Sequence, residues 1–354
     1  MNLRKDSDSE CTLTNVHQSK PNVLIAEPGL NLLPVVNFFG DQETLALLKG
    51  RSPINQTKLQ LDFDPPEGNV KIPSYLPIRN NSSKSFDWDE FQSHLTTKSL
   101  GRNIIHADLI TSTMDLTTGE LLKSGLVVIA DRQTSGKGRG ANKWLSPNGC
   151  AMFSLQLDLS LSSGIGKRLP LLLPLVCLAV VDSVNSMGNG YENLDLRLKW
   201  PNDIYAGQQC KIGGVLIYTP TIGTSVQANI GVGVNLSNEE PTKCINQMAK
   251  EKGLNPISRE IFLSQLFNKL EFYLDAIEKN FELNKEIFDK YHKYWLHSDQ
   301  SVKVQCDDGS MKLGRMVGLD PDGFLLVDVD GHKLKFHPNE NSFVVSQGVI
   351  IPNN

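Results

Sequence analysis

Hydrophobic and polar positions repeat with two different periods along the middle of the chain. Residues 150–159 alternate as a β-strand with one buried face does. Residues 258–279 instead repeat apolar side chains every three or four positions, which is the spacing of an amphipathic helix. Further strands are predicted at 103–109, 125–130, 194–200, 213–218 and 227–234, and further helices at 170–187 and 283–295. This mixture predicts an α+β fold, in which a mixed sheet carries its helices on one face.

The pattern changes after residue 300. Short alternating strands are predicted at 301–306, 312–319, 323–329 and 332–337, and Asp-Gly turn signals separate them. Such a series of short strands and tight turns predicts a small β-barrel as a separate domain over 298–354.

Residues 1–95 differ from both regions, because their short apolar runs are separated by Pro, Asn and Ser. They are slightly acidic and show no helix-turn-helix pattern, so a DNA-binding domain is not expected here. The sequence predicts a partly disordered extension of unknown role over 1–95, followed by the main domain over 96–297.

Composition restricts the class of protein. A net charge of −4 and a pI near 6.0 argue against a nucleic-acid binder. The six cysteines form no Cys-x-x-Cys pair, and the seven histidines form no ligand cluster, so no protein-bound metal is predicted. The apolar run 169–184 contains two prolines and an aspartate and predicts a buried helix, with no membrane span. The absence of an apolar signal core at the N-terminus favours a cytoplasmic location.

The segment 134–144 combines flexibility with positive charge. Glycines at 136, 138 and 140 alternate with Lys137 and Arg139, and Trp144 ends the segment. Glycines let backbone N–H groups approach a ligand, and a guanidinium binds phosphate oxygens in pairs, so the segment is suited to a phosphate ester. It is not a P-loop, because glycine follows Lys137 where a P-loop has serine or threonine.

Three further motifs follow in order: Lys-Trp-Pro-Asn-Asp-Ile-Tyr at 199–205, Lys-Ile-Gly-Gly-Val-Leu at 211–216 and Asn-Ile-Gly-Val-Gly-Val-Asn at 229–235. With the glycine segment they resemble the biotin protein ligases, and in particular the eukaryotic holocarboxylase synthetases, over roughly residues 100–350. The resemblance implies a biotin/lipoate ligase-type catalytic domain over 96–297 and an SH3-like C-terminal domain. It also implies an ATP-dependent enzyme that makes biotinyl-5′-AMP from biotin and ATP with Mg²⁺. The enzyme would then biotinylate a specific lysine of carboxylase acceptor domains.

The resemblance assigns the charged residues to steps of this chemistry. Lys211 would lie near the carboxylate of biotin and the α-phosphate, where a transition state gathers negative charge. Arg139 would cover the adenylate, with Lys137 as a weaker companion. Asp203 would orient the incoming lysine amine or accept its proton. Asp203 could instead only cap its own turn.

The remaining predicted site residues would bind the two substrates. Lys199, Asn202 and Asn235 are expected near the nucleotide, and Mg²⁺ is expected to arrive with ATP. Biotin needs an apolar slot and polar partners for its ureido ring. The predicted biotin residues are Ser112, Thr113, Gln133, Gly136, Gly138, Trp144, Gly213 and Gly214. Trp144 and Trp200 could equally be ordinary core residues.

Two other functions stay open from the sequence alone. One is a lipoate or octanoate transferase of the same superfamily, which selects a different acid. The other is a non-catalytic regulatory module that binds biotinyl-AMP or nucleic acid. No self-association element stands out, so a monomer or a weak homodimer is expected.

Overall fold

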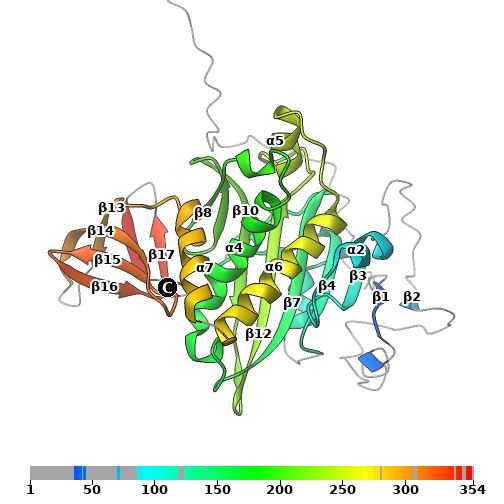
Figure 1. Cartoon of the computed structure of the whole chain (residues 1–354), viewed down its shortest axis with the longest axis horizontal. Helices are drawn as coiled ribbons and strands as arrows, with labels where there is room; N and C mark the ends of the chain where they lie inside the picture. Colours follow the sequence, from blue (N-terminus) through cyan, green and yellow to red (C-terminus); the bar gives the residue numbers. More distant parts are fainter. Residues whose placement is uncertain are drawn as a thin grey trace, which may run out of the picture.

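A mixed β-sheet forms the centre of the protein (Figure 1). The computed structural model describes residues 36–41, 43–44, 70–71, 86–118, 123–140, 142–279, 281–305, 309–338, 340–344 and 348–352. The strand order in the main sheet is β2 (Val70–Lys71), β1 (Val36–Phe39), β3 (Asn103–Ile110), β4 (Leu126–Gln133), β7 (Cys150–Ser160), β12 (Ser225–Asn235), β10 (Cys210–Tyr218), β9 (Asp203–Ala206) and β8 (Leu196–Lys199). β11 (Thr221–Ile222) pairs with β12 beside this path. Only the pair β3–β4 is parallel in this sheet as described, so the sheet is mixed as predicted.

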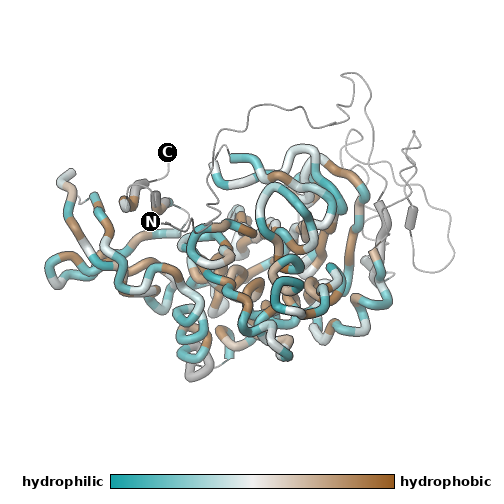
Figure 2. Tube along the Cα trace, turned by 90° about the horizontal axis from the view of Figure 1, so that it is seen from above, coloured by the Kyte–Doolittle hydropathy of each residue, from teal (hydrophilic) through white to brown (hydrophobic). Residues whose placement is uncertain are grey.

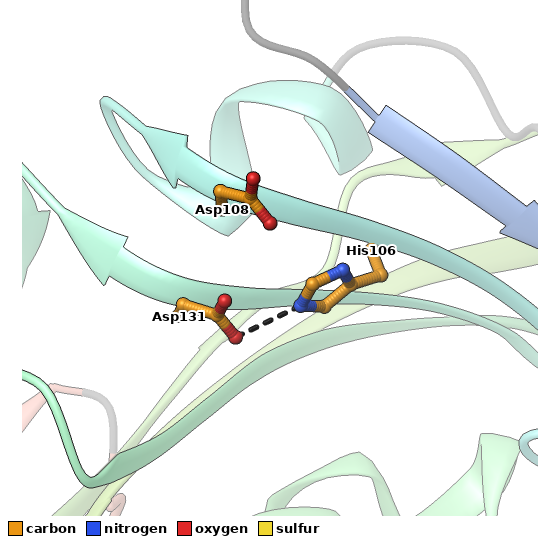
Figure 3. A group of neighbouring side chains, drawn as sticks. All are labelled: His106, Asp108 and Asp131. Carbon is orange, nitrogen blue, oxygen red and sulfur yellow. Dashed lines mark hydrogen bonds and ion pairs between the residues drawn. The ribbon is translucent and has the colours of Figure 1, made fainter. Parts of the chain in front are cut away.

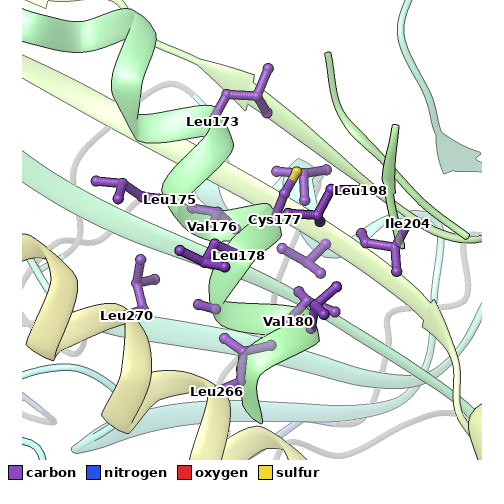
Figure 4. Close-up of a cluster of buried hydrophobic side chains, with 14 of the residues drawn as sticks. Leu173, Leu175, Val176, Cys177, Leu178, Val180, Leu198, Ile204, Leu266 and Leu270 are labelled. Carbon is purple, nitrogen blue, oxygen red and sulfur yellow. The ribbon is translucent and has the colours of Figure 1, made fainter. Parts of the chain in front are cut away.

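The long helices cover one face of this sheet (Figure 1). They are α4 (Leu172–Asn185), α6 (Arg259–Lys279) and α7 (Phe281–Tyr294), close to the predicted ranges. Every residue of α4 is buried, because the helix lies between the sheet and α6. Figure 4 shows its side chains between Leu198 and Ile204 of the sheet and Leu266 and Leu270 of α6.

The segment Gly166–Asn185, a 3₁₀ turn followed by α4, is apolar and long enough to cross a bilayer by length and composition alone. Its most apolar window is 83% buried inside the protein, so it has the place of a central core helix. Hydrophobic segments accordingly gather in the interior of the main body, with hydrophilic loops around them (Figure 2).

Two short helices were not predicted, and one of them departs from the expected arrangement. α5 (Ile245–Glu251) follows β12, and α3 (Thr113–Thr117) contacts β12 on the face away from α4. Ile230 and Val234 of β12 point into the core that α4 occupies, whereas Met114 of α3 lies over Gly231. The prediction that helices lie on one face is therefore correct for the long helices and wrong for α3.

Residues before 96 also take part in the core. β1 pairs with β3 and extends the sheet, and Phe91 of α2 (Trp88–His94) is fully buried with its ring edge-on to Phe267 of α6, 6.2 Å away. A boundary after residue 95 would separate α2 from the helix it packs on. Most of the segment predicted as an extension lies outside the described residues.

A second sheet of six strands follows α7. Its order is β16 (His332–Phe336), β15 (Leu325–Val329), β14 (Met311–Leu319), β13 (Ser301–Gln305), β18 (Val349–Pro352) and β17 (Asn341–Val344). The first four strands of this second sheet in sequence order, β13 to β16, match the predicted ranges to within a few residues. β17 and β18 were not predicted, and β18 returns to pair with β13 in parallel.

Candidate active site

A cavity of about 530 Å³ opens on the face of the main sheet away from α4. Every residue predicted for the site lines it except Gly136 and Gly213. The predicted residues that line it are Ser112, Thr113, Gln133, Lys137, Gly138, Arg139, Trp144, Lys199, Asn202, Asp203, Lys211, Gly214 and Asn235. Segments separated by more than 100 residues therefore meet at one pocket.

The charged end of the pocket centres on Asp203, the first residue of β9. Its Oδ1 lies 2.6 Å from Nζ of Lys211, and its Oδ2 lies 3.3 Å from Nζ of Lys199. The Asp203 and Lys199 side chains are only 12% and 13% exposed, whereas Lys211 is 41% exposed. A register shift between Lys211 and Gly213 marks a β-bulge in β10, and bulges of this kind redirect a side chain from its usual face.

Asn202 is fixed to the neighbouring strand by its backbone and its amide. Its Nδ2 donates to the carbonyl of Val215 at 2.9 Å, and its own carbonyl accepts from the Val215 N–H at 2.9 Å. Asn202 Oδ1 remains directed to the pocket, where Arg139 Nη1 donates to it at 3.3 Å. The turn residue thus fixes the strand and also presents an acceptor to the site.

Arg139 connects the glycine segment to the second sheet. Its Nη2 donates to the carbonyl of Asn341 in β17 at 3.0 Å. Burial lowers the pKa of Arg139 below its ordinary value, and the nearby charge of Asp203 opposes this shift. A guanidinium remains protonated even so, so Arg139 brings a half-buried positive charge to the pocket wall.

The glycine segment is a small hairpin of β5 (Gly136–Lys137) and β6 (Lys143–Trp144). A Cβ at Gly136 would lie 2.5 Å from the carbonyl oxygen of Trp144, so this glycine is required by the close approach of the two strands. The sequence predicted Gly136 as part of the biotin slot, whereas in the structure Gly136 does not line the pocket. Lys137 Nζ lies 2.5 Å from Asp115 Oδ1, which leaves it ion-paired at the rim.

Two glycines of β12 shape the apolar end of the pocket, because they have no side chains to fill it. A Cβ at Gly233 would lie 2.6 Å from Nε1 of Trp144, and a Cβ at Gly231 would lie 2.7 Å from Sδ of Met114. The two glycines of β12 therefore let Trp144 and Met114 lie flat against the sheet. Trp144 Nε1 is buried without a protein partner. Of the two tryptophans left open above, Trp144 lines the pocket and Trp200 is a core residue, 1% exposed.

A fixed set of polar groups lies beside this apolar end. Gln133 Oε1 accepts from the Thr113 N–H at 2.8 Å, and Gln133 Nε2 donates to Ser146 Oγ at 2.9 Å. Ser154 Oγ donates to Thr113 Oγ1 at 2.8 Å, and Ser112, the N-cap of α3, is 1% exposed. Because these side chains orient one another, they offer hydrogen bonds to a ligand in a defined geometry.

Asn235, the last residue of β12, also lines the pocket. Its Nδ2 donates to Thr242 Oγ1 at 2.7 Å, and Thr242 Oγ1 donates to the Lys211 carbonyl at 3.1 Å. Cys150 Sγ donates to Asn235 Oδ1 at 3.3 Å. This chain of contacts joins the ends of β10 and β12 to the loop before α5. Gly213 does not line the pocket, because the side on which it would carry a Cβ faces the Gly233 carbonyl and Ile204.

Sequence reasoning missed several lining residues. They are Met114, Asn142, Lys143, Leu145, Phe153, Pro201, Val215, Leu216, Gly231, Val232, Gly233, Pro241, Thr242 and Phe343. The glycines and Val232 stand inside the motif 229–235, so their period was a signal that could have found them. Phe343 comes from β17, and no local pattern ties it to residues 134–235.

A separate polar cluster lies on β3 and β4, and none of its residues line the pocket (Figure 3). His106 Nε2 lies 2.8 Å from Asp131 Oδ1, and Arg259 of α6 donates to the same oxygen. Burial would raise the pKa of Asp131, but its hydrogen bond with His106 and the charge of Arg259 outweigh burial and keep that pKa below its ordinary value. Asp108 is exposed nearby. Because a guanidinium already neutralises Asp131, this cluster is a structural ion pair between sheet and helix.

Comparison with known proteins agrees with this geometry. The Biotin/lipoate A/B protein ligase family matches residues 107–235. The biotin–protein ligase of Homo sapiens is 37% identical over 79% of this chain, which spans 40% of the human protein. Biotin–protein ligase 2 of Arabidopsis thaliana is 32% identical over 77% of this chain and 84% of its own length. A biotin protein ligase structure from Aquifex aeolicus, in complex with biotin and ATP, has a TM-score of 0.53 at 24% identity, covering 71% of this chain and 99% of that one.

The fold and the match over residues 107–235 relate the chain to the biotin/lipoate A/B protein ligases. Within that class, the chain belongs to the biotin–protein ligase family. The extent of the matches to the Arabidopsis thaliana ligases supports this assignment, because they cover most of those proteins as well as most of this chain.

Proposed function

We propose that the chain activates biotin with ATP to give biotinyl-5′-AMP and then transfers biotin to a lysine of a carboxylase acceptor domain. One observation carries the proposal: the apolar and the cationic ends belong to one pocket, and Lys211 lies at their junction. Its Nζ is 6.0 Å from the centre of the Trp144 ring and 2.6 Å from Asp203. An acid bound along Trp144 would therefore present its carboxylate beside the phosphate-binding charges.

In the first step, a carboxylate oxygen of biotin forms a bond to the α-phosphorus of ATP. The bond from that phosphorus to the bridging oxygen breaks, and pyrophosphate leaves with the electron pair. Negative charge accumulates on the phosphate oxygens, and Lys211, Lys199 and Arg139, which line the pocket, would stabilise it. The residues supply positioning and positive charge and form no covalent bond to the substrates.

In the second step, a neutral lysine amine attacks the acyl carbon, and AMP leaves with the electron pair of the acyl–oxygen bond. Asp203 is the carboxylate at the pocket that can orient this amine and accept its proton. Both of its oxygens contact lysine ammonium groups before substrates bind. Phosphate oxygens that attract Lys211 and Lys199 would release the carboxylate for the amine.

Biotin recognition is assigned to the opposite end of the pocket. Gln133, Thr113 and Ser112 would bind the ureido ring, because they hold both donors and acceptors in fixed positions. Trp144 and the glycines of β12 would enclose the apolar part of the ligand. Asn235 and Asn202 would lie near the nucleotide.

Mg²⁺ would enter as the complex with ATP. Asp203 is the one carboxylate among the described residues that line the pocket, and its two oxygens already contact ammonium groups. The metal would therefore be held mainly by phosphate oxygens and waters, and it would neutralise charge on the leaving pyrophosphate.

Several broader assignments belong to the same proposal. Short strands and tight turns, together with the parallel return of β18 to β13, support an SH3-like barrel over 298–354 after a catalytic domain ending near 297. Four free, buried cysteines support a reducing cytoplasmic compartment. The net charge of −4 supports a protein partner without nucleic acid, and we assign a monomer or a weak homodimer.

The test is pyrophosphate release by the purified chain with MgATP and either biotin or lipoate. A biotin-specific burst, converted to continuous turnover by an acceptor domain, is expected. Release with lipoate alone would assign the chain to lipoate chemistry instead. Tight biotinyl-AMP binding without any release would favour a regulatory module.

A further inference from the structure

The second sheet contributes directly to the pocket through one strand, β17. Phe343 lines the cavity and is 5% exposed, and two residues earlier the carbonyl of Asn341 accepts a hydrogen bond from Arg139 at 3.0 Å. Arg139 and Asn341 are 202 positions apart in the sequence. The tip of the glycine hairpin is therefore attached to a strand that the sheet of the main domain does not contain.

Packing around Phe343 fixes the position of β17. Its ring lies edge-on to His297, with ring centres 5.0 Å apart and planes at 88°. His297 is itself 3% exposed and is oriented by a 2.7 Å hydrogen bond between its Nδ1 and Gln300 Oε1. The Asn341 N–H and side-chain amide both donate to the His337 carbonyl, at 3.0 and 3.2 Å. The Asn341 carbonyl that Arg139 contacts is thus fixed on one side by the hydrogen bonds to His337 and on the other by the packing of Phe343 on His297.

Two acceptors of Arg139 are neutral oxygens. Asn202 Oδ1 and the Asn341 carbonyl bind the guanidinium directionally without neutralising its charge. Hydrogen bonds from a charged donor to neutral acceptors contribute modestly in net terms, whereas bidentate contacts to phosphate are stronger. Arg139 is therefore held near the pocket before a ligand arrives and can exchange an acceptor for a phosphate oxygen.

We propose that Asn341 and Phe343 are positioning residues for Arg139, and that β17 thereby determines how long an acyl-adenylate is retained in the pocket. The second half of this statement rests on the function proposed above. Without the contact to β17, the glycine hairpin would lose its attachment, and Arg139 would spend less time over the ligand. Neither residue needs to touch the reacting atoms for this effect.

The first experiment needs no activity. Limited trypsin digestion of the full chain without ligands measures opening of the hairpin as cleavage after Arg139. Phe343→Ala should raise this cleavage rate by about fivefold or more, because the hairpin opens more often. Met316→Ala is the matched control, since Met316 is fully buried in the second sheet and does not line the pocket. Phe343→Leu, which keeps apolar bulk but removes the ring edge, gives the same comparison where the alanine variant folds poorly. Equal cleavage in Phe343→Leu, Met316→Ala and the unaltered chain would overturn the proposal.

The second experiment is a mutant cycle on escape of the intermediate. Free biotinyl-AMP released per ATP consumed should rise several-fold in Phe343→Ala and in Arg139→Gly. The double variant should release no more than Arg139→Gly alone, because Phe343 acts through Arg139. Additive effects would show that Phe343 acts independently and would overturn the proposal. If the unaltered chain makes no biotinyl-AMP, the proposed function fails, and the digestion still decides whether β17 positions Arg139.

Discussion

Lys211 and Asp203 form a 2.6 Å ion pair at the junction of the apolar and charged ends of the pocket, and Lys199 approaches the second oxygen of the same carboxylate at 3.3 Å. One anion therefore keeps two ammonium groups in position before a phosphate is present. Such preorganisation avoids part of the cost of arranging charges during the reaction. It also links the two proposed steps, because the lysines that turn to phosphate leave Asp203 available for an amine.

Lys211→Ala should slow formation of biotinyl-AMP. Removing one preorganised charge from a transition state typically costs about 2–4 kcal/mol, or roughly 30- to 1000-fold in rate. Single-turnover pyrophosphate release measures this step. Lys312→Ala is the control, because Lys312 is an exposed lysine of the second sheet, 3.7 Å from Asp330. An unchanged rate in Lys211→Ala would refute the assigned role.

Asp203→Asn should slow transfer more than activation. The amide keeps the shape of the side chain but cannot accept a proton, and general-base groups typically contribute about 10²–10⁴-fold. The measurement is a chase of preformed enzyme-bound biotinyl-AMP with an acceptor domain. Asp299→Asn, which alters an exposed ion pair with Arg315, should leave both steps unchanged. Equal slowing of the two steps in Asp203→Asn would contradict the division of roles.

Gly233→Ala should weaken biotin binding with little effect on ATP. The added Cβ would lie 2.6 Å from Trp144 Nε1, so the indole must shift. Overpacking of this kind costs about 1–3 kcal/mol, which corresponds to roughly 5- to 150-fold in KM for biotin. Gly214→Ala is a comparison within the same pocket, because its Cβ would meet Lys211 side-chain atoms at 3.6 Å and the Asn202 carbonyl oxygen at 3.8 Å, both ordinary contacts. Similar KM values for both variants would count against Trp144 as a wall of the biotin slot.

The elements that the sequence predicted well have a strong local signal. The apolar run 169–184 reflects burial on all sides, and the alternation in 150–159 reflects a strand with one buried face. The ends of α4 and β7 fall within two residues of the expected ones. Residues 203–206 form β9, which was not predicted, because only a turn ending at Asp203 was expected after the strand 194–200. The register that makes them a strand comes from pairing with β10, which a local pattern cannot record.

The site shows the same division. The alternation of glycines and cations indicated Arg139, and the resemblance of the later motifs indicated Asp203 and Lys211; all three line one pocket. Gly136 has the same composition signal but serves the close approach of two strands, and sequence cannot separate these causes. Phe343 was missed as a pocket residue because its place depends on the packing of one sheet on another.

Tyr273→Phe should destabilise the fold without changing the site. Tyr273 Oη donates to the buried Asp182 at 2.6 Å and so joins α6 to α4. Loss of a hydrogen bond to a buried charge costs about 1.5–3 kcal/mol in the free energy of unfolding. Urea denaturation measures the change. Tyr191→Phe, which removes a hydrogen bond to the Asn255 carbonyl at the surface, should cost roughly 0.5 kcal/mol. Equal losses would show that Asp182 does not depend on Tyr273.

His297 should make the stability of the protein depend on pH in mildly acidic solution. Burial lowers the pKa of His297 to about 4, although its hydrogen bond to Gln300 opposes the shift. In the unfolded chain a histidine has its ordinary pKa near 6.5. Between these values the unfolded state binds the proton and the folded state does not. The free energy of unfolding is therefore highest above the unfolded pKa and decreases as the pH falls from about 6.5 towards 4.

The size of this effect follows from the two pKa values. From neutral pH to pH 5, His297 should remove about 2 kcal/mol from the free energy of unfolding. His297→Phe keeps a ring against Phe343 but cannot take up the proton, so its unfolding free energy should fall less over the same interval. His292 and His337, whose pKa values are also lowered by burial, leave a remaining slope of the same sign. Denaturation curves of both proteins at pH 7.5 and pH 5 measure the difference. Parallel losses would mean that burial does not keep His297 neutral in the folded protein at pH 5.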